Sequence, residues 1–324
     1  KVVLDGQTGK LPSSDEPLTV QAEISLPEAN SSVSFNGVAS TKQPYDAQGK
    51  AKLDVQSPDK LAQLLGVQST FHQSVSLDGL LTANQHKVQY DDLKFALGNF
   101  VGSGKFSIEN INTENPLNLK GNIKSGSVLD IDSLMPKSSA KKSEEKTSND
   151  DLQNAGKIKS SSKAIIPQTL TLPMAVNTDI QLDVGGIKFQ NQNVKGVFLD
   201  LNKEGATTKA SFKTLELPGQ AKADGTLTVT YASTSKASKT KQITYSDPNV
   251  SYDINGQIGQ LATFLKAFAP DANTGTVTKL YKTAQFDLKG KVNGNSISLS
   301  DSTLKLDEMV VGLGGRYEPA TSSK

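Results

Sequence analysis

The sequence contains no cysteine and no tryptophan, and Arg316 is its single arginine. The absence of cysteine excludes disulfides, thiolate metal sites and cysteine nucleophiles. The net charge is only +2, and nearly all the basic residues are lysines. This composition argues against a protein that binds nucleic-acid phosphates. We therefore expect no nucleic-acid partner.

Long apolar runs are also absent, because nowhere do about 18 apolar residues follow one another. These residues therefore contain neither a membrane-spanning helix nor a signal peptide. The chain starts at Lys1 without methionine, so we expect a processed or excised piece whose targeting segment lies outside it. Apolar residues make up 35% and aromatic residues 6% of 324 residues, a lean content that suits thin sheets with one buried face.

Short runs that alternate apolar and polar residues dominate the chain. Examples are "LTVQAEISL", "VSLDGLL", "LKFAL", "GTLTVTYA" and "AQFDLKGKV", with turns rich in Gly, Asn or Asp between them. The pattern predicts a mainly β protein, in which repeated antiparallel meanders form an extended curved sheet or sheets.

Two helical patterns interrupt the strands. "SPDKLAQLLGV" has Ser57 as an N-cap and Gly66 as a stop, and predicts a helix over 57–66. "GQIGQLATFLKAFAP" has apolar residues at Ile258, Leu261 and Leu265 and a stop at Pro270, and predicts a helix over 256–269. We expect both short amphipathic helices to cap ends of the sheet.

The ribbon sequence recurs along the chain. "VSLDGLLTANQHKVQYDDLKFALGNFVGSGKF" aligns without a gap to "AQFDLKGKVNGNSISLSDSTLKLDEMVVGLGGRY" at an offset of 211, which matches Gly79 with Gly290. The helical pattern before each copy aligns at an offset of 200. A looser third copy covers residues 179–201.

A polar stretch separates two β regions. Residues 136–163, "PKSSAKKSEEKTSNDDLQNAGKIKSSSK", carry almost no large apolar groups and predict a flexible linker. The interleaved acidic residues argue against a basic membrane tether. We expect an N-terminal β region over 1–135, the linker, and a C-terminal β region over 164–324.

Catalytic groups are scarce. His72 and His86 are the only histidines, and the position of His86 in a predicted turn or strand start favours a solvated residue over a ligand or a general base. Adjacent Asp91 and Asp92 would point to opposite faces of a strand, which favours a turn over a carboxylate pair. We predict no catalytic residue, no metal site and no cofactor, and hence a protein that is not an enzyme.

Alternation instead predicts one continuous apolar face. A curved sheet that leaves part of this face open would form a groove for lipids or acyl chains, whereas the simpler interpretation is a core between sheet and helices. The candidate lipid-binding residues are Leu77, Leu81, Val88, Leu93, Phe95, Leu97, Phe106, Ile180, Leu182, Phe189, Leu199, Phe212, Phe286, Leu288, Leu299, Leu304 and Leu306.

The order of these segments resembles the AsmA family of bacterial envelope proteins. The resemblance rests on "SPDKLAQLLGV", the glycine-punctuated ribbon after it, "LNLKGNIKSGSVLDIDSLMP", and a turn at Leu217-Pro218-Gly219-Gln220 where the family has a double glycine. It covers most of residues 56–317 except the linker. It implies an N-terminal inner-membrane anchor absent from this chain, a periplasmic location, and a role in outer-membrane biogenesis and lipid, notably phospholipid, transport through a β-groove.

Two functions therefore lead, and an enzyme ranks third behind them. The first is a non-enzymatic envelope protein that carries lipids along a hydrophobic β-groove. The alternative is a structural or adhesive β-rich envelope protein that acts through contacts with other envelope proteins. An apolar face open to solvent would favour the first, and a face wholly capped by helices the second.

Overall fold

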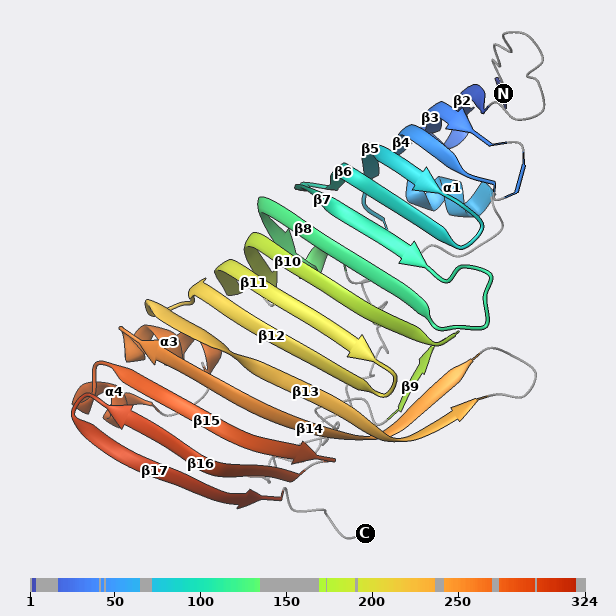
Figure 1. Ribbon diagram of the computed structural model, residues 1–324. Helices are drawn as coiled ribbons and strands as arrows, with labels where there is room; N and C mark the ends of the chain where they lie inside the picture. The colour runs from blue at the N-terminus through green and yellow to red at the C-terminus, as the bar shows by residue number, and fades with distance from the viewer. Residues whose placement is uncertain are drawn as a thin grey trace, which may run out of the picture.

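The computed structural model shows a mainly β protein built around one large open sheet (Figure 1). It describes residues 2–3, 17–40, 42–43, 45–64, 72–134, 169–172, 174–189, 192–236, 242–269, 274–294 and 296–318. The expected linker over 136–163 lies outside these residues. None of the described helices has the length and apolar character needed to cross a membrane.

The strands are longest in the middle of the sheet. They are β1 (Val2–Val3), β2 (Leu18–Leu26), β3 (Ser31–Ala39), β4 (Ala47–Val55), β5 (Val75–Ala83), β6 (Lys87–Leu97), β7 (Phe100–Glu109), β8 (Leu117–Asp130), β9 (Thr169–Leu172), β10 (Val176–Phe189), β11 (Gln192–Glu204), β12 (Thr207–Glu216), β13 (Ala221–Lys236), β14 (Ile243–Ile258), β15 (Ala284–Asn293), β16 (Ser296–Leu306) and β17 (Met309–Tyr317). The helices are a 3-10 turn (Pro27–Ala29), α1 (Pro58–Leu64), α2 (Ile131–Leu134), α3 (Leu261–Phe268) and α4 (Gly275–Leu280).

Nearly every strand pairs antiparallel with the strand that follows it, so the predicted meanders are confirmed. The exception lies at the middle, where β8 and β10 run parallel and join the N-terminal and C-terminal β regions in one sheet. The short strand β9 instead pairs with the first residues of β14, Ile243 to Ser246. The sheet therefore runs without interruption from β2 to β17.

The sheet is curved, and its helices lie on one side of it. In Figure 1 the ends of β8, β10 and β11 curl behind the sheet, the side on which α1 and α3 are seen. Leu261 of α3 is buried with Ala221, Ile258 and Ala284, which are terminal residues of β13, β14 and β15. A second buried cluster of Phe100, Val184 and Val197 lies at the same end of the strands. The helices thus cap one end of the sheet, as the sequence predicts.

The helix boundaries need correction. The first helix is Pro58–Leu64, and the stop expected at Gly66 lies outside the described residues. The second begins at Leu261, because Gly256 to Ile258 continue β14 and pair with β15. Ile258 joins the same buried cluster as Leu261, so its apolar character fits the helical spacing although it lies in a strand. The sequence patterns predict neither α2 nor α4.

The repeat offset also needs correction. The strands β5 and β15 begin at Val75 and Ala284, an offset of 209, and the starts of β6 and β16 and of β7 and β17 differ by the same number. Asp92 and Asp301, also 209 apart, both have φ of 48° at a break in strand register. A shift of two residues keeps every side chain on its face, so 211 reproduces the alternation equally well.

The expected offset between the two helices was wrong for a similar reason: a shift of about one helical turn leaves the apolar pattern unchanged. The helices α1 and α3 begin at Pro58 and Leu261, an offset of 203 where 200 was expected. Three residues are close to one helical turn, so the apolar stripe is preserved by that shift. The duplicated unit is therefore a strand, a helix and three strands, from β4 to β7 and from β14 to β17.

Candidate binding face

Strand register places apolar side chains opposite one another across the whole sheet. Leu182 of β10 faces Leu199 of β11, and Leu199 faces Phe212 of β12. Residues directly opposite each other in a sheet point to the same side, so the register defines one surface, here called the apolar face. It is the side that the helices cap, since Ala221, Ile258 and Ala284 also belong to it.

Every predicted lipid-binding residue whose side chain is described lies on the apolar face. Phe189 is on β10 opposite Gln192, but its side chain lies outside the described part. The face also includes residues that the prediction omitted on the flanking and intervening strands, although the same alternation marks them. They include Val20, Phe35, Leu53, Leu227, Tyr252 and Leu313.

Most of the apolar face is only partly buried. Among the predicted residues Leu93 is buried, at 5% exposure, and the others with described side chains are partly exposed. Near the N-terminal edge Ile24 and Val33 are 40% and 47% exposed. Along the N-terminal strands the described structure therefore leaves apolar side chains that no second layer fully covers, whereas Ile243, Tyr245 and Val250 of β14 are buried at the end of the strands away from α3.

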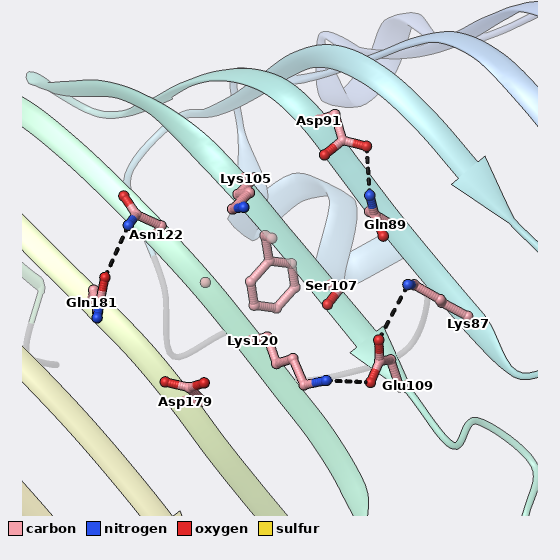
Figure 2. A pocket seen from close by; sticks show the side chains of 12 residues that line it. Lys87, Gln89, Asp91, Lys105, Ser107, Glu109, Lys120, Asn122, Asp179 and Gln181 are labelled. Atoms are coloured by element: carbon pink, nitrogen blue, oxygen red, sulfur yellow. Dashed lines mark hydrogen bonds and ion pairs between the residues drawn. The ribbon is translucent and has the colours of Figure 1, made fainter.

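The opposite surface, the polar face, is rich in charged and amide side chains. A hollow of about 410 Å³ lies on it, over β6, β7, β8 and β10. Figure 2 shows the side chains that line this hollow. Glu109 lies between two lysines there, 3.2 Å from Lys87 and 2.8 Å from Lys120. Hydrogen bonds from Lys120 and then Lys87 lower the pKa of the Glu109 carboxyl. Asn122 donates to Gln181 at 3.0 Å, so these groups largely satisfy one another.

Both histidines make local contacts. His72 Nδ1 lies 2.7 Å from Asp59 Oδ1, with both side chains exposed beside α1. His86 Nδ1 donates to the Ile111 carbonyl at 3.0 Å and its backbone N–H donates to Asn84, so His86 holds a turn together. Within the described ranges no three His, Asp or Glu side chains cluster closely enough to hold a metal ion.

A polar row interrupts the apolar face near one end of the strands. Thr178 of β10 faces Lys203 of β11, and Lys203 faces Thr208 of β12. The sequence contains a sign of this row that the prediction missed. In "VFLDLNKEG" a lysine follows Val197, Leu199 and Leu201 at the inward position of the alternation.

Lys203 is held by backbone and by an aromatic ring. Its Nζ donates to the carbonyls of Val176, at 3.0 Å, and Gly205, and lies 4.8 Å from the centroid of the Tyr245 ring. Burial lowers the pKa of the Lys203 ammonium. Tyr245 is itself 3% exposed and packs against Tyr231, with ring centroids 5.7 Å apart.

Unlike the ammonium group of Lys203, the hydroxyl group of Thr178 has no hydrogen-bond partner among the described residues. Its oxygen atom, Oγ1, is buried. A buried hydroxyl without a partner is unfavourable, so this atom marks a position where a further polar group would be stabilised.

Comparisons of the chain with protein-family profiles, with curated protein sequences and with solved structures find no match.

Proposed function

We propose that the apolar face shelters the acyl chains of lipids and that the protein is a non-enzymatic lipid carrier. The observation that supports this function is the continuity of the face, which passes through the parallel pair β8 and β10 and whose apolar side chains are for the most part only partly buried. The polar face gives the same sheet a water-compatible outer surface.

The energetics suit this role. Burial of one methylene group is worth about 0.8 kcal/mol, so sheltering one long acyl chain from water contributes on the order of 10 kcal/mol. At roughly 4.8 Å per strand, the row from β2 to β17 spans about 70 Å. Duplication of the β4–β7 unit lengthens such a surface without requiring new chemistry.

The cellular setting of the proposal comes from the sequence resemblance to the AsmA family. On that resemblance we propose that the protein acts in the periplasm and is tethered to the inner membrane by a segment outside the given sequence. Its role there would be outer-membrane biogenesis through transport of phospholipids between the two membranes.

A matched pair of variants on neighbouring residues tests lipid binding. Leu199 lies partly exposed on the apolar face, whereas Phe198, 42% exposed, lies on the polar face of the same strand. Leu199→Asp should sharply reduce the lipid that co-purifies with the protein, because a carboxylate beside an acyl chain is costly. Phe198→Asp removes a larger apolar group and should leave lipid retention unchanged.

Mass spectrometry of extracted lipids provides the measurement, and thermal melting separates a lost groove from a lost fold. Wild-type protein free of lipid, or a well-folded Leu199→Asp variant with undiminished lipid, would contradict the proposal.

The open edge of the sheet favours a second candidate function, attachment to another envelope protein. In the described part of the chain β17 pairs with β16 alone. Val310 and Tyr317 on this strand are 65% and 64% exposed. A strand with one unpaired edge and few charges is a ready template for pairing with a strand of another protein.

A further inference from the structure

The polar row lies at the end of the strands that is opposite the helices. Lys203 is the second-last residue of β11, directly before the turn at Gly205, which has φ of 53°. The other ends of the strands meet α1, which follows Val55, and α3, which follows Ile258. The row therefore stands at the end of the apolar face away from α1 and α3, where the Tyr245 ring of β14 lies over Lys203.

Lys203 differs from the other lysine of its strand. Lys195, at the helix end of β11, is exposed and pairs with Glu216 at 3.0 Å. No described carboxylate forms an ion pair with Lys203, whose contacts are two carbonyls and the Tyr245 ring. A half-buried ammonium without an anion, next to the unpartnered Thr178 hydroxyl, has the electrostatic and hydrogen-bonding character of an anion site.

The length of the strand beyond the row fits one acyl chain. From Thr178 to Val184 the strand β10 advances six residues, or about 20 Å at 3.3 Å per residue. The inward positions on this stretch are Ile180, Leu182 and Val184. One leaflet of a bilayer core is about 15 Å thick, half of roughly 30 Å, so chains of membrane lipids fit between the row and the helix end.

We propose that Thr178, Lys203 and Thr208 receive the phosphate of an anionic phospholipid, whose acyl chains lie along the apolar face toward the helices. This inference rests on the proposed lipid-binding function and adds a head-group preference and an orientation to it. Lys203 supplies the charge and a donor, and the two threonine hydroxyls supply further donors.

The test compares two lipids that differ in the head group alone. The purified chain, freed of lipid, is offered dioleoyl phosphatidylglycerol and uncharged dioleoylglycerol, and the retained lipids are quantified after gel filtration. Wild-type protein should prefer phosphatidylglycerol. Lys203→Met should lower its retention about tenfold, the loss expected for one charged hydrogen bond, with dioleoylglycerol unchanged.

Two control variants isolate the charge at this position. Lys203→Arg should keep the preference, and Lys209→Met, on the exposed polar face of β12, should behave as wild type. Inorganic phosphate in large molar excess should not displace the lipid. Displacement by phosphate would overturn the head-group assignment in favour of a site for the free ion.

The outcomes distinguish this inference from the function on which it depends. Retention of neither lipid by wild-type protein would refute the lipid-carrier proposal and this inference together. Retention of both lipids without preference, or an equal loss of both in Lys203→Met, would refute the head-group site alone.

A threonine variant gives a second readout. Thr178→Val removes the buried unpartnered hydroxyl, so the lipid-free protein should be equally or more stable, while phosphatidylglycerol retention falls. A stability loss in the lipid-free protein without any change in retention would contradict a role for Thr178 in lipid binding.

Discussion

Leu182 of β10 faces Ile123 of β8 in a parallel register. This pair lies where the N-terminal and C-terminal regions of the chain meet, and both side chains belong to the apolar face. The two regions therefore share one surface, although the chain between β8 and β10 must return to the end of the sheet where β8 began. Continuity of the face depends on this junction more than on any single hairpin.

Two glycines at the β8–β10 junction, Gly185 and Gly126, differ in the space available for a side chain. A Cβ on Gly185 would lie 2.2 Å from the Gly126 carbonyl oxygen, whereas a Cβ on Gly126 would meet nothing within 4 Å. Gly185→Val should lower the free energy of unfolding by about 1–3 kcal/mol, and Gly126→Ala should change it by less than about 0.5 kcal/mol. Urea denaturation measures both, and equal effects would argue against this packing at the β8–β10 junction.

The corrected repeat predicts which residues are equivalent. Asp92 and Asp301 both occupy left-handed backbone conformations at register breaks. Valine there should cost about 1–2 kcal/mol of stability at either site, while glycine should be nearly neutral. Thr303, the partner of Asp92 at the offset of 211, lies in regular strand pairing and should tolerate valine. Thermal melts of the five single variants decide between the two alignments.

The hydrogen bonds of Asp307 predict that the stability of the folded protein depends on pH in the acid range. The Thr283 hydroxyl donates to its carboxylate at 2.7 Å, and the backbone N–H groups of Lys282 and Thr283 donate at 3.0 and 2.9 Å. These bonds, led by that of the Thr283 hydroxyl, lower the pKa of Asp307 below its ordinary value of 3.8. The carboxylate therefore stabilises the folded state fully above the unfolded pKa, and this contribution is lost as the pH falls through the lower folded pKa.

Asp307→Asn should accordingly be less stable than wild type at neutral pH, and the difference should close below about pH 4. Glu308→Gln removes the next carboxylate along the chain and should leave the curve of stability against pH unchanged. A constant difference across the acid range would show that the charge of Asp307 is not what stabilises the contact between the β16–β17 turn and the residues before β15.

The exposed edge of β17 leads us to predict that the protein associates with itself and that one lysine substitution on this strand reduces the association. If β17 pairs with a second molecule, light scattering of concentrated wild-type protein should detect it, and Val310→Lys should reduce it. Val38→Lys adds the same charge to β3, which is paired on both sides, and should have no effect. Association equally strong in the Val310→Lys variant would exclude this edge as the contact.

Errors of the sequence interpretation fall where two periodic patterns coincide. Ile258 satisfies both the spacing of a helix and the alternation of a strand, and pairing with Ala284 places it in β14. The repeat offset was wrong by two residues, the period of a strand, and the helix offset by three residues, which is close to one helical turn of 3.6 residues. The register breaks at Asp92 and Asp301 fix the true alignment, and they exist only in the paired sheet.

Alternation of apolar and polar residues determined by itself that the chain forms strands, and it assigned each predicted side chain to the inward or outward set. That follows because successive side chains on a strand point to opposite sides regardless of which strands pair. Tertiary structure alone decided that all the inward sets join one face, since the order of strands and the parallel pairing of β8 with β10 depend on contacts between distant residues. It alone also brought Thr178, Lys203 and Thr208 into a row, because three strands must pair in register before side chains so far apart in sequence can share one site.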